Sequence, residues 1–169
     1  NVSANVGKPQ VVYRETILEP SVSEVALDRE IAGQARYAKV SVLIEPQERG
    51  KGVDVKSRIE PDAFPPKLIE AALSAMDDAS LSGPILGYPL HDVKLRLLSA
   101  EKRDGISDEM AFSIAAAMAV KEAARTGRPI LLEPVMVVDI VTPEEFMGEI
   151  IGDLNGRGGH LRGIDSRGK

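Results

Sequence analysis

The sequence has 169 residues, of which 43% are hydrophobic and 28% charged, a composition typical of one folded domain, or of one domain and part of another. It has no cysteine, which excludes disulfides, cysteine-ligated metal centres and thiol nucleophiles, and its net charge of −5 argues against a wholly basic nucleic-acid binder. No apolar run reaches the roughly 20 residues of a membrane helix and the first residues do not resemble a signal peptide, so we expect a soluble, cytoplasmic protein without membrane partners.

The first part of the chain predicts a sheet. Residues 2–6 and 10–17 are rich in strand-forming residues and predict a hairpin. Residues 19–31 are polar and acidic and are compatible with either a strand pair or a loop. Apolar and polar residues alternate over residues 37–46, which predicts a half-buried strand, and a shorter strand follows between residues 53 and 59.

Helices alternate with strands in the next part. Pro65-Pro66 suits the first turn of a helix, and apolar residues then recur on one helical face up to Met76. A strand is predicted over residues 93–97. A second helix begins at Ser107, with acidic residues in its first turn, and ends before Gly127.

The last part combines a strand-like run with a basic tail. Residues 130–141 are the most strand-like in the chain, and Pro134 indicates an edge, a bulge or a boundary within them. A third helix is predicted from Thr142, which has capping-box spacing with an acid three residues later, to Gly152. Residues 156–169 carry four basic residues and one acidic residue, so any RNA contact should be regional, and we expect a piece of a longer protein.

Candidate chemistry is sparse. Residues 163–169 match the first seven positions of the phosphate-binding pattern GxxxxGK[ST], but that pattern needs a hydroxyl residue next and a helix behind it, so we interpret the match as accidental. His91, Asp92 and His160 do not make a zinc set. His91 and Asp92 are neighbours in a strand-like stretch, so their side chains are expected on opposite faces. The adjacent acid pairs are better explained as solvated helix faces. The residues alone indicate an α/β protein without a visible active site.

Two segments suit RNA phosphates better than catalysis. Residues 32–36 form a small-residue stretch with two hydrogen-bonding side chains, and residues 101–105 form a charged turn. Such segments are more often plain surface loops. If both lie at one end of the domain, they form a tip whose basic residues can contact a nucleic-acid backbone.

Residues 5–17, Asn-Val-Gly-Lys-Pro-Gln-Val-Val-Tyr-Arg-Glu-Thr-Ile, closely resemble the opening of domain IV of elongation factor G, the translational GTPase that drives ribosomal translocation. Further segments follow in the family's order and cover essentially the whole chain: Ser82-Gly83-Pro84, Gly87-Tyr88-Pro89, residues 107–112, residues 132–136, residues 142–145 and residues 151–155.

The resemblance implies an architecture. Residues 1–131 correspond to domain IV, an α/β (α+β) fold of two layers with a left-handed βαβ crossover. Residues 132–169 correspond to the first half of domain V, an incomplete ferredoxin-like βαβ segment. Half of such a sheet leaves an open edge, so homo-association through this edge is expected.

The resemblance also implies partners and site residues. The family's domain IV tip enters the decoding region of the small ribosomal subunit, where it meets tRNA and mRNA as they move. The corresponding tip residues are Gly33, Gln34, Arg36, Lys102 and Arg103, and the RNA-facing residues of domain V are Arg157 and Arg162.

Both tip loops depart from the family's pattern. The first usually reads Gly-Gly-Arg-Gly-Gln before a tyrosine, and the second usually has a histidine at the position of Arg103. Here donors are permuted between Gln34 and Arg36, while Ala32 and Ala35 replace glycines, which strains the loop if those positions need positive φ. We therefore expect a divergent paralogue.

Several functions remain open. The leading expectation is a non-enzymatic, ribosome-binding fragment that promotes translocation, with no cofactor of its own, while GTP and Mg²⁺ belong to the parent GTPase. A paralogue acting in ribosome recycling or ribosome protection is the alternative, although no feature of the sequence supports protection. A stand-alone small-molecule kinase or ATPase of related left-handed fold is the alternative from another class.

Overall fold

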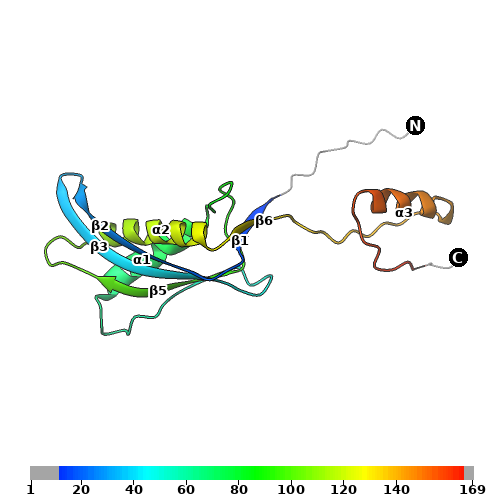
Figure 1. The fold of residues 1–169 in the computed structure, drawn as a ribbon. Helices are drawn as coiled ribbons and strands as arrows, with labels where there is room; N and C mark the ends of the chain where they lie inside the picture. Colours follow the sequence, from blue (N-terminus) through cyan, green and yellow to red (C-terminus); the bar gives the residue numbers. More distant parts are fainter. Residues whose placement is uncertain (1–11, 166–169) are drawn as a thin grey trace. The chain divides into compact units, whose positions relative to one another are not determined.

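The computed structural model describes residues 12–165, which fall into two units, Asn1–Pro134 and Val135–Lys169 (Figure 1). The predicted strand at residues 2–6, and with it the predicted hairpin, lies outside the described residues, as does Lys169. The elements of the first unit are β1 (Arg14–Ile17), β2 (Ser21–Ile31), β3 (Gln34–Pro46), β4 (Val53–Ser57), α1 (Pro66–Ser80), β5 (Val93–Glu101), α2 (Glu109–Thr126) and β6 (Pro129–Leu132).

The first unit has a four-stranded sheet with the order β2-β3-β5-β4. β2, β3 and β5 pair in antiparallel fashion, whereas β4 runs parallel to β5 and is joined to it through α1. β4, α1 and β5 thus form a βαβ unit. Helices α1 and α2 pack on each other and against the sheet (Figure 1). The predicted mixed α/β fold is confirmed.

The core of this unit follows the predicted alternation along β3. Val40, Val42 and Ile44 are fully buried between the sheet and the helices, whereas Lys39 and Ser41 lie on the other face and stay partly exposed. Alanines dominate the buried face of α2, which lets the helix approach the sheet closely.

Residues 19–31, ambiguous in sequence, contain the single long strand β2. It pairs with β3 from Ser21↔Ile44 to Ile31↔Gln34. Its sequence is polar because it is an edge strand, in which only Ser23 and Leu27 are buried. Pairing with a long neighbouring strand, rather than local composition, decides this element.

A second, two-stranded sheet joins β1 and β6, with Arg14 opposite Leu132 and Ile17 opposite Pro129. The strand-like run at residues 130–141 therefore forms a strand only in its first part, and that strand belongs to the first unit.

The second unit contains a 3-10 turn, η1 (Glu144–Phe146), followed by α3 (Met147–Gly156). The predicted capping box is wrong: no side chain caps η1 or α3, and the Thr142 hydroxyl donates to the Pro143 carbonyl instead. The predicted end at Gly152 is also wrong, since the helix runs four residues further. Glycine is tolerated within a helix at a cost of about 1 kcal/mol.

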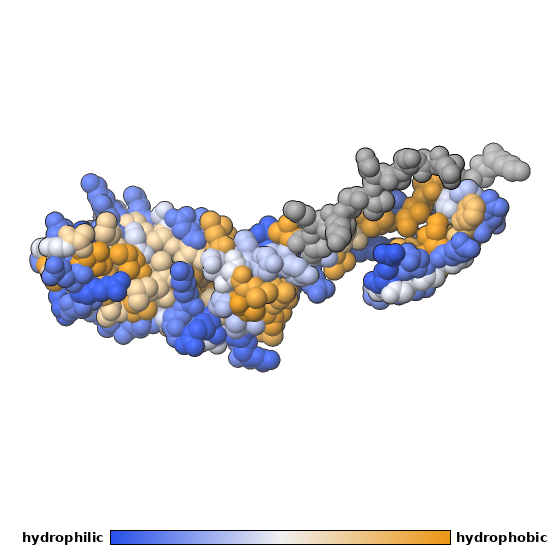
Figure 2. Space-filling model, turned by 90° about the horizontal axis from the view of Figure 1, so that it is seen from above, coloured by the Kyte–Doolittle hydropathy of each residue, from blue (hydrophilic) through white to orange (hydrophobic). Residues whose placement is uncertain are grey.

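No strand forms among residues 135–165, so the described residues show the helix of the expected half-sheet and not its strands. Strands need partners to pair with, and this stretch instead leaves apolar side chains exposed, which Figure 2 shows in orange. They are Val135, Met136, Val137, Val138, Ile140 and Val141.

Candidate nucleic-acid interface

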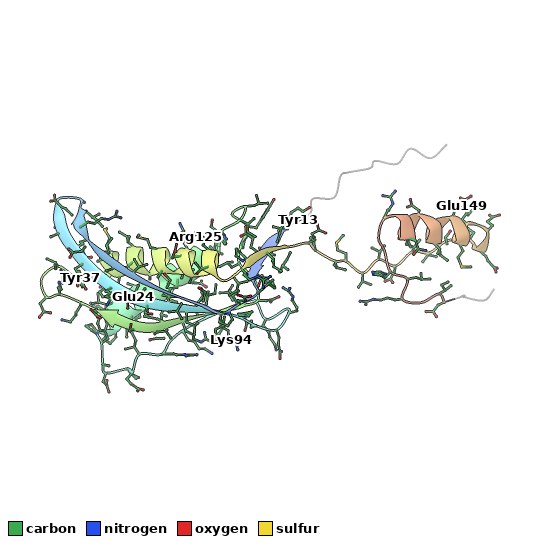
Figure 3. All side chains as sticks on the ribbon, viewed as in Figure 1. Tyr13, Glu24, Tyr37, Lys94, Arg125 and Glu149 are labelled. Atoms are coloured by element: carbon green, nitrogen blue, oxygen red, sulfur yellow. The ribbon has the colours of Figure 1, made fainter. Side chains whose placement is uncertain are left out.

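Two loops meet at the end of the first unit where the β2–β3 hairpin turns. The first is the turn after Ile31, and the second, residues 102–108, joins β5 to α2. The Tyr37 amide donates to the Ile106 carbonyl over 2.7 Å, and the Ser107 hydroxyl donates to the Tyr37 carbonyl. Figure 3 labels Tyr37 at this end of the sheet. The structure therefore brings Gln34 and the loop that carries Arg103 to the same end.

The hairpin turn has two residues in the left-handed region. Ile31 pairs with Gln34 across the turn, and between them Ala32 has a φ of 53° and Gly33 a φ of 74°. Positive φ at both central positions is the geometry of a type I′ turn, whose twist suits a hairpin. Glycine tolerates this conformation, whereas alanine is strained by about 1 kcal/mol. Ala35 lies in β3 and does not have a positive φ. Of the two alanines that replace glycines, only Ala32 therefore has the strained conformation.

Arg36 connects the two loops from a buried position, with 8% of its surface exposed. Its Nε donates to Asp108 Oδ2 over 2.8 Å, its Nη2 donates to Gln34 Oε1 over 3.0 Å, and its Nη1 donates to the Ile31 carbonyl. The guanidinium therefore forms its hydrogen bonds within the tip, and Arg36 stabilises the two loops and contributes little to the exposed surface.

Asp108 is the acidic partner in this arrangement and also the N-cap of α2. Its Oδ1 accepts the Ala111 amide over 2.8 Å, while its Oδ2 accepts Arg36. Burial raises the pKa of the Asp108 carboxyl, but hydrogen bonds from Ala111 and Arg36 outweigh it, so the pKa lies below its ordinary value. Asp108 thus stays ionised at neutral pH and keeps the two loops joined.

Arg103 is half-exposed and rests on Tyr37. Its Cζ atom lies 3.7 Å from the centroid of the Tyr37 ring, and its Nη1 donates to Asp28 Oδ2 over 2.8 Å. Lys102 pairs with Asp104, whose pKa this lysine lowers. Each of these cations has an exposed acid beside it, and exposed ion pairs of this kind contribute little stability.

A depression of about 370 Å³ lies between the two loops. It is lined by Gln34, Ala35, Gly105, Ile106, Ser107 and Asp108. Of the predicted tip residues, Gln34 lines this depression, Gly33 forms the turn beside it, and Lys102 and Arg103 are exposed on the second loop.

The predicted RNA-facing residues of the second unit are exposed. Arg157 follows α3 and pairs with Asp153, its Nε lying 2.8 Å from Oδ2. Arg162 lies in the irregular segment after the helix.

The prediction that His91 and Asp92 lie on opposite faces is wrong. Asp92 has a φ of 57° and is not in a strand, and its Oδ1 lies 3.5 Å from His91 Nε2. Burial raises the pKa of Asp92, but backbone amides, including that of Gly52 at 3.0 Å, outweigh it and lower the pKa overall. The carboxylate therefore holds the turn before β4, which is a structural role.

Sequence reasoning missed Glu15, a fully buried acid in β1. Its carboxylate accepts the amides of Ile85 and Leu86 over 2.8 Å each and of Tyr88 over 3.0 Å. It thereby organises the loop before β5. The available signal was an acid within an otherwise strand-like run. A carboxylate in such a run is buried when the strand folds and then needs hydrogen-bond partners.

Residues 12–165 contain no group of three or more histidine, aspartate or glutamate side chains placed to hold a metal ion. Within the same stretch, none of the helices combines the length and apolar character that crossing a bilayer requires.

Comparison with known proteins identifies the family. The family model described as "Elongation factor G, domain IV" matches residues 9–128, and the one described as "Elongation factor G C-terminus" matches residues 130–169. A crystal structure of a protein from Thermus thermophilus superposes with a TM-score of 0.85 at 28% identity, over 95% of this chain and 24% of that one. The chain thus spans about a quarter of that relative's length. Two successive family models over nearly the whole sequence show that this chain belongs to the elongation factor G family of translation factors, of which it comprises domain IV and C-terminal sequence.

Proposed function

We propose that this chain is the ribosome-contacting part of an elongation factor G-like GTPase, and that its tip enters the decoding region of the small subunit to promote movement of tRNA and mRNA. The observation that carries the proposal is the meeting of two loops at one end of the first unit, tied together through Arg36 and Asp108. The parent protein is proposed to be cytoplasmic and to bind GTP and Mg²⁺ outside this segment.

The exposed donors at the tip suit an RNA backbone. Gln34, Lys102 and Arg103 are exposed there, and Gly33 forms the turn directly before Gln34. Lys102 and Arg103 contact acids only on the surface, so exchanging those acids for phosphate oxygens costs little. The role is one of positioning and electrostatics, and no bond is made or broken by these residues.

A specific observation favours a second candidate, a paralogue acting in ribosome recycling. Arg103 stands where the family usually has a titrating histidine, and it is held on Tyr37 and Asp28 with a permanent charge. A tip changed at this position can keep ribosome binding while losing efficient translocation.

The second unit is proposed to make two further contacts. Arg157 and Arg162 are exposed and suit large-subunit RNA. The exposed apolar residues between positions 135 and 141 suit strand pairing. Two copies of this chain are proposed to associate through them.

A chimaera tests the proposal. The corresponding segment of an active translocase is replaced by this chain, and translocation and recycling rates are measured separately, with a K102A/R103A chimaera as the control. Translocation that depends on Lys102 and Arg103 supports the leading proposal, and recycling without translocation favours the second candidate. A chimaera that supports neither process, although it is folded, overturns both.

A further inference from the structure

The orientation of the Gln34 amide is fixed by the chemistry of its partner. Arg36 Nη2 lies 3.0 Å from the Gln34 side chain. A guanidinium has only donors, so the atom that faces it must be the amide oxygen. The oxygen and nitrogen ends of the Gln34 amide are thus distinguished by the hydrogen bond to Arg36.

The Gln34 amide is therefore oriented with its oxygen towards Arg36. Its carbonyl accepts Arg36, so the NH₂ group is what the side chain has to offer to a ligand. Gln34 is exposed and lines the depression between the loops. A ligand atom that meets the NH₂ end of this amide must be an acceptor.

Arg36 is itself held in place and cannot turn to a ligand without losing its own partners. Its three nitrogens donate to Asp108, Gln34 and Ile31, and Asp108 is held in turn by the Ala111 amide. The orientation of Gln34 is thus built into the junction of the two loops with α2.

We propose that Arg36 is a positioning residue that fixes Gln34 as a hydrogen-bond donor for a phosphodiester oxygen of RNA at the depression between the two loops. The proposal rests on the proposed function and deepens it, because it assigns different tasks to two residues of one loop. Gln34 contacts the RNA backbone, and Arg36 acts only through Gln34. Phosphate oxygens are acceptors throughout, which suits an amide whose oxygen faces Arg36 and whose NH₂ group does not.

The first test needs no ribosome. The side-chain NH₂ signals of Gln34 are assigned by NMR in the unaltered chain and identified by their absence in Q34A. We expect R36K to keep the ion pair with Asp108 but to move the Gln34 signals to the positions of a free glutamine, because lysine lacks the planar fork. R125K, at an exposed pair with Glu122, is the control and leaves them unchanged. Unchanged Gln34 signals in both R36K and R36M, with both variants folded, overturn the inference.

The second test measures the affinity of this chain for small ribosomal subunits. Q34A and R36K are each expected to weaken binding about three- to tenfold, the range of one hydrogen bond, and the double variant no more than either alone. Q34E is expected to weaken it further, because a carboxylate repels phosphate. Equal affinity of Q34A and the unaltered chain, or additive losses in the double variant, overturns the inference.

The two proposals fail in different ways. If the unaltered chain does not bind small subunits, the proposed function fails, and the NMR experiment still decides whether Arg36 orients Gln34. If the unaltered chain binds and K102A weakens binding while Q34A does not, the proposed function stands and only the inference fails.

Discussion

Arg103 lies over Tyr37 with 3.7 Å between its Cζ atom and the ring centroid. The amide and the carbonyl of Tyr37 both form hydrogen bonds to the loop that carries Arg103. One residue of β3 thus fixes the second loop to the sheet. The cation at this position is held in place by an aromatic ring and an acid.

R103H is expected to make ribosome affinity pH-dependent. An imidazole titrates near about pH 6.5, so the affinity of R103H should fall as the pH rises from about 6 to about 8. The unaltered chain should keep one affinity over the same range, because a guanidinium, unlike an imidazole, has no charge change between about pH 6 and about pH 8. Binding to small subunits at several pH values checks this, with R103Q as the uncharged control. An affinity of R103H that does not change with pH would contradict the prediction. So would an affinity that changes with pH in both the unaltered chain and R103Q.

D108N is expected to destabilise the first unit. The asparagine oxygen can still cap Ala111, but its NH₂ then faces Arg36 Nε, so two donors meet and about 1–3 kcal/mol of unfolding free energy is lost. Denaturant unfolding measures this loss. The control is E109Q at the neighbouring exposed acid in the first turn of α2, expected to cost less than D108N, about 0.3–1 kcal/mol. Equal stability of D108N and the unaltered chain would show that the contact between Asp108 and Arg36 contributes nothing to stability.

The same carboxylate predicts a loss of stability in acid. The pKa of Asp108 is lowered on folding, because hydrogen bonds from Ala111 and Arg36 outweigh the opposing effect of burial. Its contribution is therefore fully present above the unfolded pKa of about 4 and is lost as the pH falls through the folded pKa. Unfolding curves measured down to about pH 3 should show this loss, and the loss should be smaller in D108N. Identical acid profiles for D108N and the unaltered chain would refute the assignment.

A32G is expected to stabilise the hairpin. Ala32 has a φ of 53°, and removing its Cβ relieves about 1 kcal/mol of strain, which the greater freedom of glycine in the unfolded chain partly offsets. A net gain of about 0.5 kcal/mol should raise the melting temperature. The reverse change one position later, G33A at a φ of 74°, should lower it. A lower melting temperature for A32G would show that the turn adapts to alanine.

E15Q is expected to destabilise the first unit by about 2 kcal/mol, because one carboxylate oxygen that accepts a backbone amide becomes an NH₂ donor. Glu19 serves as the matched control, since it is exposed and pairs with Arg128 on the surface, so E19Q should change little. Thermal unfolding of both variants checks the difference. Similar losses in E15Q and E19Q would mean that the loop before β5 does not depend on the Glu15 carboxylate.

Residues with strong local signals were predictable from the sequence, and residues decided by distant partners were not. The alternation along residues 37–46 and the apolar face after Pro65 predicted β3 and α1. β2 was ambiguous because an edge strand need not be apolar, and its identity comes from pairing with β3. Residues 135–141 looked like a strand and are not one, because a strand requires a partner that the described residues do not provide.

The tip was predictable in composition and not in arrangement. The sequence identified Gln34 and Arg36 as donors, but burial and the contact with Asp108 give them different tasks, and the contact between Arg36 and Asp108 spans 72 residues of sequence. Glu15 was missed for the same reason, since the amide of Ile85 that it binds lies 70 residues further along the chain. Local patterns cannot specify such pairs.

The central claim is that the loop end of the first unit faces small-subunit RNA, and directed hydroxyl-radical cleavage tests it most directly. The chain has no cysteine, so K102C provides a single attachment site for an iron chelate at the tip, and R125C provides one in the last turn of α2, the end of that helix away from Asp108 (Figure 3). We expect the probe at position 102 to cleave ribosomal RNA of the decoding region and the probe at position 125 to leave it intact. Cleavage of that RNA from position 125 and not from position 102 would contradict the account.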